Sequence, residues 1–406
     1  MLLNRERARA MMVQHGLDAL VATSAENVTY ATGFANWTIY TFRDLEVYGI
    51  IPREGPIALV VPIDAADYLA QVHVDVSRLY AYGTFHTTRA PEVTLQGAEA
   101  KLFEIREEVS HHPTGVAALS QALTDLEIGG SLGVDERGMP PARWRSLVEA
   151  FPRHTLSEAH DFFRAVRMVK TAEEIMRLRT AVQAVEHGML TAFRRAVAGV
   201  TEAELETAFR EAVVSRGVMP GHFETSAGTR SAGCFPTTAD YHIQPGDIVR
   251  SDSGGRFRGY WADTGRTAAL GVPPAKLARY YDALHAGITM MLGMAKPGVP
   301  VADLYRAAME TVRSAGIPHY QRHHVGHAIG LEFYEAPVLV DASHSGDIHR
   351  LGSTETRLEP GMVVNIELPY YELGLGGLQI EDTLVIRPSG YELLTTASRT
   401  LLPAGA

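Results

Sequence analysis

Four carboxylates lie in apolar, strand-like stretches of the C-terminal half of the chain. Asp252 and Asp263 are 11 residues apart, on the two arms of an expected hairpin. Glu367 lies in the segment Val-Val-Asn-Ile-Glu-Leu, and Glu381 in Leu-Gln-Ile-Glu-Asp-Thr-Leu-Val-Ile. A carboxylate in a buried strand is costly unless it is paired or binds a metal. Two divalent cations would supply a common counter-charge, because one carboxylate can bridge two ions.

A histidine between glycines is the fifth candidate ligand. His327 lies in the segment Gly-His-Ala-Ile-Gly, whose glycines would let the backbone approach the site closely. Each candidate alone has an ordinary explanation. An aspartate in a hairpin is more often a turn residue, a histidine beside glycines is more often structural, and Glu381 could pair with an arginine. The ordered set of five is a far more specific signal than any one member.

The elements that must position these residues indicate about two domains, because 406 residues exceed what one ordinary core supports. Residues 4–15 have helical spacing, with Gly16 as a C-cap. Strand-like segments follow at 18–23, 57–62 and 133–135, and a further helix is expected at 142–151. Strands that alternate with helices favour an α/β N-terminal domain.

A change of pattern near residue 165 begins the second domain. Capping boxes at 171–174 and 201–204 predict helices that end near Ala196 and Gly217. A hairpin is expected from strands 243–253 and 260–270, joined by the Gly-rich stretch 254–259. Two helices and a second strand pair follow, at 275–295, 301–315, 362–369 and 378–386. The order helix, helix, hairpin thus occurs twice, without an obvious repeat of residues.

Composition limits the possible partners and compartments. The net charge is −10 and there is no basic run, so nothing supports nucleic-acid or anionic-membrane binding. Cys234 is the only cysteine, which excludes an intrachain disulfide and fits a reducing compartment. No signal-peptide core and no window of roughly 18 apolar residues is present. These features predict a cytoplasmic protein.

The ordered motifs resemble those of the creatinase/prolidase/aminopeptidase P family. The first metal hairpin, the histidine motif and the two glutamate motifs of that family are similar to residues 245–267, 326–337, 359–367 and 376–382. Residues 9–34 and 163–171 also resemble it, so the likeness covers nearly the whole chain. It implies an α/β creatinase-type accessory domain over residues 1–164. An α+β "pita-bread" catalytic domain, like that of M24 metallopeptidases, would follow over 165–406.

The resemblance also implies two divalent metal ions, commonly manganese, cobalt, zinc or iron. Asp263 and Glu381 would bridge both ions, Asp252 would complete one site, and His327 with Glu367 would complete the other. All five ligand positions are intact, which argues against the mechanism of creatinase itself, where they are replaced. A homodimer is implied as well, with the N-terminal domain near the partner's active site.

The expected substrate shell departs from the peptidase pattern of this family. A usual histidine is missing from the Cys234-Phe235 region, and another is replaced by Tyr334, while His323 fills the third histidine position. Two further positions differ from the usual arginine and threonine, namely Gln379 and Gly265. Histidine can donate a proton near neutral pH, whereas phenylalanine cannot and tyrosine is a far weaker acid. This pattern fits either a slow peptidase or an enzyme specialised on another small substrate.

The pattern favours metal-assisted hydrolysis of a C–N bond, as in Xaa-Pro peptidases. Two cations would lower the pKa of a shared water that attacks an amide carbonyl. We expect Glu367 to act as general base, His323 to hold the substrate or oxyanion, and Tyr334 to donate a hydrogen bond. His222 and Arg266 are further candidates for substrate contact. A solvated loop histidine and a structural ion pair are their simpler interpretations.

Two other classes of function stay open. The alternative enzymes are non-peptidase members of the same fold, either a small-metabolite amidohydrolase or a lyase resembling dimethylsulfoniopropionate lyases. A lyase would abstract a proton instead of adding water, so its product would be an alkene. A non-enzymatic binding module predicts lost metal ligands, and none is lost here. A small molecule or short peptide is therefore the expected partner.

Overall fold

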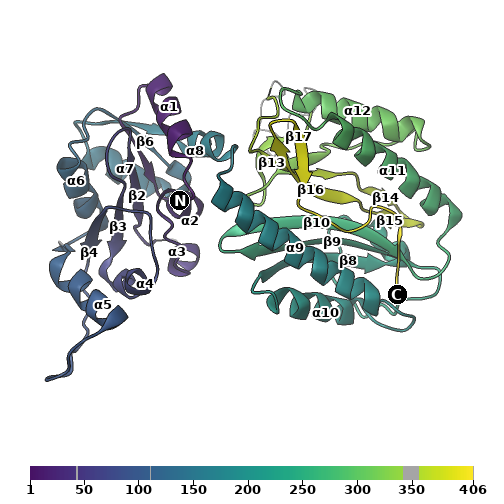
Figure 1. Cartoon of the computed structure of the whole chain (residues 1–406), viewed down its shortest axis with the longest axis horizontal. Helices are drawn as coiled ribbons and strands as arrows, with labels where there is room; N and C mark the ends of the chain where they lie inside the picture. Colours follow the sequence, from purple (N-terminus) through teal and green to yellow (C-terminus); the bar gives the residue numbers. More distant parts are fainter. Residues whose placement is uncertain (43, 110, 342–355, 406) are drawn as a thin grey trace. The chain divides into compact units, whose positions relative to one another are not determined.

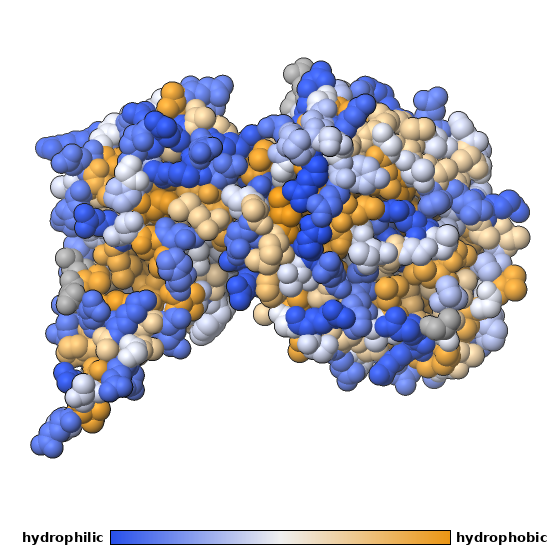
Figure 2. Space-filling model, in the orientation of Figure 1, coloured by the Kyte–Doolittle hydropathy of each residue, from blue (hydrophilic) through white to orange (hydrophobic). Residues whose placement is uncertain are grey.

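The structure is a computed structural model, and it describes residues 1–42, 44–109, 111–341 and 356–405. These residues form two compact units, Met1–Arg167 and Met168–Ala406 (Figure 1). The boundary expected between residues 164 and 165 therefore lies inside the last helix of unit 1, α8 (His160–Arg167). On the face drawn in Figure 2, hydrophobic and hydrophilic residues are interspersed over both units. Within the described ranges, no helix is long and apolar enough to cross a membrane.

A seven-stranded mixed sheet forms the centre of unit 1, in the order β5-β4-β3-β2-β1-β6-β7. Its strands are β1 (Ala19–Ala22), β2 (Tyr48–Pro52), β3 (Ala58–Pro62), β4 (Arg78–Tyr82), β5 (His111–His112), β6 (Ser131–Val134) and β7 (Thr155–Glu158). The other helices of the unit are α1 (Arg5–His15), α2 (Ala25–Thr32), α3 (Thr38–Thr41), α4 (Ala66–Gln71), α5 (Gly97–Glu108), α6 (Gly115–Asp125) and α7 (Pro141–Ala150). The α/β class expected for the N-terminal domain is confirmed.

Local sequence explains where the first elements of unit 1 begin and end. The Asn4 side chain accepts a hydrogen bond from the Arg7 backbone N–H, and α1 ends at Gly16, whose φ is 66°. This left-handed conformation suits glycine, which has no Cβ. All four residues of β1 are buried, as expected for a strand that is covered on both faces.

A nine-stranded sheet dominates the described part of unit 2, in the order β12-β11-β13-β16-β10-β9-β8, with β17 on β16 and β18 on β10. Its strands are β8 (Met219–Ala227), β9 (Ile248–Phe257), β10 (Tyr260–Ala269), β11 (Gly326–Ala328), β12 (Glu335–Val338), β13 (Val363–Glu367), β16 (Glu381–Arg387), β17 (Gly390–Leu393) and β18 (Leu402–Pro403). A separate short hairpin pairs β14 (Tyr370–Glu372) with β15 (Gly376–Leu378). The pairs along this order are antiparallel. The antiparallel sheet and its helices confirm the α+β class.

Four long helices cover the sheet of unit 2. They are α9 (Ala172–Arg195), α10 (Glu202–Val214), α11 (Ala275–Met294) and α12 (Val301–Ser314). Both predicted capping boxes are present, at Thr171 and Thr201. Helix α9 packs against β9 and β10, α10 packs against β8, and α11 contacts α12 and β13 (Figure 1). Buried side chains such as Ile288, Val312 and Leu384 join α11, α12 and the strands in one hydrophobic core.

The first hairpin differs from its prediction in the length of its turn. The Gly-rich stretch 254–259 was expected to be a loop, but β9 continues to Phe257 and the turn consists of Arg258 and Gly259 alone. Both turn residues have positive φ, 47° and 91°, which is typical of a two-residue hairpin turn. The extra strand residues set the register that places the acidic side chains.

Candidate metal centre

A row of paired residues crosses four neighbouring strands of unit 2. Asp252 of β9 pairs with Gly265 of β10, which pairs with Glu381 of β16, which pairs with Glu367 of β13. Residues that are directly opposite in a sheet point to the same face. Gly265 has no side chain, and a Cβ there would lie 2.2 Å from Cγ of Gln379. The row therefore brings three carboxylates to one face of the sheet.

Asp263 and His327 join this row from neighbouring positions. Asp263 is two residues before Gly265 on β10, so the period of a strand puts both on the same face. His327 of β11 pairs with Asn365, which is two residues before Glu367 on β13. The four carboxylates and this histidine thus come from five adjacent strands, not from loops.

The possible ligand atoms form two overlapping groups. One oxygen or nitrogen each from Asp263, His327 and Glu381 lies within 4.8 Å of the others. A second group of the same size contains His222, Asp252 and Asp263. Asp263 belongs to both groups, as expected for a carboxylate shared by two ions.

Glu367 lies beside the two groups and contacts a histidine and an arginine. Its Oε1 is 3.1 Å from Nδ1 of His324, and its Oε2 is 3.6 Å from an Nη2 of Arg322. Burial raises the pKa of the Glu367 carboxyl, against the opposing effect of Arg322. The carboxylate is therefore held in a fixed position next to the Asp263–His327–Glu381 group.

Burial and mutual repulsion raise the pKa of two of the carboxyl groups, whereas nearby imidazoles lower that of a third. Burial raises the pKa of Asp252 and, still more, that of Glu381, and the charge of Asp263 adds to both. Burial also acts on Asp263, but the neighbouring imidazoles of His222 and His327 hold the pKa of this carboxyl below its usual value. Without a further counter-charge, the site therefore favours the protonated forms of Asp252 and Glu381.

The donor set fits divalent cations. Glu381 accepts hydrogen bonds from the amide groups of Asn365 at 2.9 Å and Gln379 at 3.3 Å, but in the described ranges no Lys, Arg or His nitrogen forms an ion pair with it. Asp263 is 5% exposed, and its Oδ1 is a buried oxygen without a hydrogen-bond partner. Buried carboxylate oxygens that lack a hydrogen-bond donor, or that have only uncharged donors, are what oxygen-preferring metals bind.

The structure separates two adjacent histidines. His323 was expected to hold the substrate, but its side chain is exposed, whereas His324 is buried and contacts Glu367. Both residues precede β11, so they lie outside the regular alternation of a strand. The geometry therefore assigns to His324 the position beside the acidic cluster that was expected for His323.

Tyr334 lies directly over a candidate ligand. Its ring stacks on the imidazole of His327, with ring centroids 3.8 Å apart and planes 20° apart. Its hydroxyl is 3.4 Å from Nε2 of His324. Burial and the nearby carboxylates raise the pKa of the phenol, so it stays protonated and can donate a hydrogen bond.

Arg266 has a different place from the one expected for a substrate-binding residue. It is fully buried, and its guanidinium forms a 2.6 Å ion pair with Asp382. The remaining N–H groups donate to backbone carbonyl oxygens of Gly265, Glu381, Ala397 and Ser398. A buried guanidinium with this many protein acceptors supports the backbone of Glu381, and this corrects the expectation of a substrate contact.

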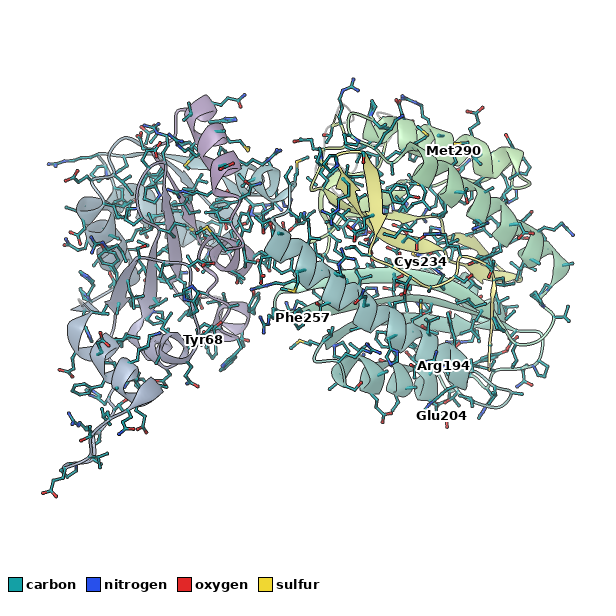
Figure 3. All side chains as sticks on the ribbon, in the orientation of Figure 1. Tyr68, Arg194, Glu204, Cys234, Phe257 and Met290 are labelled. Carbon is teal, nitrogen blue, oxygen red and sulfur yellow. The ribbon has the colours of Figure 1, made fainter. Side chains whose placement is uncertain are left out.

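The segment that lacks the usual histidine is at the surface. Cys234, labelled in Figure 3, is exposed. Its Sγ is 3.8 Å from the Tyr371 hydroxyl, and the side chain of Phe235 is 80% exposed. Cys234 lies in an irregular segment after the short helix η3 (Gly228–Ala232), and its exposed side chain contacts Tyr371 of β14.

Sequence reasoning missed Asn365 as a neighbour of the acidic cluster, and it named Gln379 only as a departure from a usual arginine. Asn365 is two residues before Glu367, and Gln379 is two residues before Glu381. The period of a strand predicts that such residues share a face. Their amide groups reach Glu381, and Gln379 also donates to Asp252 at 3.1 Å. Alternation within the two glutamate segments was therefore a usable signal.

Comparison with known proteins gives matches over both units. Residues 176–388 match the family described as metallopeptidase family M24, and residues 4–169 match the creatinase/prolidase N-terminal domain. An Xaa-Pro dipeptidase of Lactobacillus delbrueckii subsp. lactis is 29% identical over 272 residues, which are 66% of this chain and 71% of the relative. An Xaa-Pro dipeptidase of Pyrococcus furiosus is 30% identical over 263 residues, or 63% of this chain and 72% of the relative.

A solved structure shows the same fold over almost the full length. The prolidase from Pyrococcus horikoshii OT3 superimposes with a TM-score of 0.76 at 22% sequence identity, covering 98% of this chain and 99% of that one. At this identity the likeness shows the fold alone.

Proposed function

Because the chain belongs to metallopeptidase family M24 and carries a creatinase/prolidase N-terminal domain, we propose that it hydrolyses a C–N bond of a short peptide, like an Xaa-Pro dipeptidase. The observation that carries this proposal is the pair of ligand groups that share Asp263 on one face of the sheet. Such a pair suits two adjacent cations, which is the arrangement used in many dinuclear hydrolases.

Five side chains would hold the two ions. They are Asp252, Asp263, His327, Glu367 and Glu381, with the two carboxylates at 263 and 381 shared. Manganese, cobalt, zinc and iron all suit a set of carboxylates with histidine. When bound, the ions would supply positive charge that polarises the substrate carbonyl and lowers the pKa of the attacking water.

The remaining steps fall to groups of the protein. Glu367 would accept the proton of the attacking water, since its carboxylate is held beside the shared ligands by His324 and Arg322. His324 takes over the role expected for His323 and would help to hold the substrate. The protonated hydroxyl of Tyr334 would donate a hydrogen bond to the oxyanion that forms from the carbonyl.

A second candidate substrate class follows from the residues around the metal ligands. Tyr334 occupies the space over His327, and the Cys234-Phe235 segment supplies no histidine. These differences make a small-metabolite amide, or a lyase substrate whose proton is abstracted, the second candidate beside a short peptide. The same ligands would serve either reaction.

The test is a hydrolysis panel with metal-stripped protein. Xaa-Pro dipeptides and tripeptides would be assayed with manganese, cobalt, zinc or iron(II) restored separately, with Asp263→Asn as the inactive control. We expect metal-dependent cleavage, with solvent ¹⁸O incorporated into the new carboxylate. No cleavage by protein that binds metal would point to a non-peptide substrate, and with such a substrate an alkene product without solvent oxygen would establish a lyase. Equal activity of the control would refute the assignment of the site.

We also propose a homodimer, as the family resemblance implies. The mass of the protein in solution, from light scattering after size-exclusion chromatography, tests this directly. A chain of 44.2 kDa that elutes as a single copy at micromolar concentration would contradict it.

A further inference from the structure

His222 is placed against the candidate metal centre from a strand that carries none of the five expected ligands. It lies on β8, at the edge of the sheet order next to β9. Its Nε2 is 3.2 Å from Oδ1 of Asp263 and 3.5 Å from Oδ1 of Asp252. Its side chain is 22% exposed, so the ring is mostly enclosed. It is therefore not the solvated loop histidine that the sequence suggested as its simpler interpretation.

An irregularity in β8 directs this side chain. The pairing of β8 with β9 shifts in register between Pro220 and Phe223, so Gly221 and His222 fall outside the regular ladder. A bulge of this kind re-aims side chains, and bulges are common next to functional sites. In this bulge the imidazole of His222 turns towards the two aspartates.

The neighbouring strand is shaped to admit the imidazole. A Cβ at Gly254 would lie 2.2 Å from Cε1 and 2.5 Å from Nδ1 of His222, so any larger residue would collide with the ring. Gly254 pairs with Asp263 across the hairpin, which puts the free space directly beside that carboxylate. The ring of Phe333 forms a T-shaped contact with the imidazole, at 5.1 Å between centroids.

The contact with Asp263 is not an ordinary hydrogen bond. Oδ1 of Asp263 has no hydrogen-bond partner although Nε2 of His222 is only 3.2 Å away, so the approach lacks hydrogen-bond geometry. The nitrogen faces the space between two aspartate oxygens instead. One imidazole nitrogen and two carboxylate oxygens that converge within 4.8 Å are a typical partial shell for zinc and similar metals.

We propose that His222 is a sixth protein ligand of the dinuclear centre, and that it supplies a nitrogen to the ion held by Asp252 and Asp263. This rests on the proposed function, which places an ion there. Each ion would then have one histidine, His222 on one side and His327 on the other. A nitrogen ligand on both ions favours zinc, cobalt or iron over manganese, because imidazole suits these borderline metals better.

The test measures bound zinc directly and does not depend on turnover. Wild-type protein, His222→Gln and the control His242→Gln, which changes an exposed histidine of the same unit, would be titrated with buffered free zinc. We expect two zinc ions per chain in the wild type and the control. In His222→Gln, one of the two sites should weaken by at least about 10-fold, since loss of a mere partner of a ligand already costs that much. Gly254→Ala, which fills the space for the ring, should weaken the same site.

A second measurement uses the unaltered protein. The outer-shell signals in the zinc X-ray absorption spectrum count imidazole ligands, so about one imidazole per zinc supports the proposal, and about half of that overturns it. Unchanged zinc binding by a folded His222→Gln variant would also overturn it, while leaving the five-ligand centre in place. Failure of the wild type to bind zinc, manganese or cobalt would refute the metal centre itself, and with it this proposal.

Discussion

Replacing Glu381 with glutamine should stabilise unit 2 in the absence of metal and remove most of its response to metal. Glu381 is 1% exposed, and its nearest described hydrogen-bond donors are the uncharged amides of Asn365 and Gln379. Burial and the neighbouring aspartates raise its pKa, so the metal-free protein holds either an unfavourable charge or a retained proton. Glutamine has the shape of the protonated form and carries no charge.

The magnitude of the metal response follows from binding linkage. An ion at 100 times its dissociation constant stabilises the folded state by about 2.7 kcal/mol. For a unit of roughly 240 residues, each kcal/mol raises Tm by about 2–4 °C. One ion should therefore raise the Tm of unit 2 by about 5–11 °C, and two ions should raise it further. Because Glu381 is a proposed bridge, the glutamine variant should rise by a few degrees at most.

Differential scanning calorimetry at pH 8, with and without added zinc or manganese after dialysis against chelator, measures both effects. Glu310→Gln removes an exposed glutamate of α12 in the same unit and is the matched control. It should behave as the wild type does. If Glu381→Gln keeps the full metal-induced rise in Tm, Glu381 is not a ligand. If it is less stable than the wild type without metal, the reasoning about the surplus charge is incorrect.

Three further predictions concern single side chains. Arg266→Lys should lower the free energy of unfolding of unit 2 by about 3–5 kcal/mol. Lysine cannot replace both the ion pair with Asp382 and the hydrogen bonds to backbone carbonyl oxygens. A loss below about 1 kcal/mol, measured by calorimetry, would contradict this. Burial raises the pKa of Glu174 to about 7, so the folded state keeps a proton that the unfolded chain loses. The free energy of unfolding should therefore fall by up to about 3 kcal/mol as pH rises from 4.5 to 7. Denaturant titrations should show that Glu174→Gln lacks this decrease, and an identical pH profile would refute the assignment. Tyr334→Phe should lower kcat by roughly 10-fold, the value of one hydrogen bond, with zinc affinity unchanged; unaltered kcat would exclude its hydroxyl from the reaction.

Much of the fold was predictable because its signals are local. The capping boxes at Thr171 and Thr201 begin α9 and α10 as expected, since a threonine and a glutamate three residues later satisfy the same helix end. Gly16 ends α1 for an equally local reason. The end of β9 was harder to predict from the sequence, because a Gly-rich stretch resembles a loop unless its partner strand is known. The glycine at 254 is explained by the imidazole of His222, from a distant part of the chain.

In the candidate site, too, residues positioned by regular strands were predictable, and residues positioned by irregular backbone or distant partners were not. The five expected ligands lie in strands, where register and alternation bring them to one face of the sheet. Whether His323 or His324 faces Glu367 depends on irregular backbone before β11, for which no period exists. The inward position of His222 depends on a bulge that only the pairing of β8 and β9 reveals. The structural role of Arg266 was hidden for the same reason, because its acceptors at Glu381 and Ser398 lie more than 100 residues further along the chain.

The candidate ligands lie on strands and the side chains around them on connecting segments, and this difference affects how the protein can evolve. The five candidate ligands lie on paired strands, where a shift of one residue would disturb every neighbour. Tyr334, His324 and Cys234 lie on connecting segments, which accept substitutions, insertions and new conformations more readily. Selection can thus alter which molecule is recognised while the chemistry of the centre is inherited intact. Proteins that descend from one ancestral hydrolase can therefore differ in substrate specificity and still share the same metal centre.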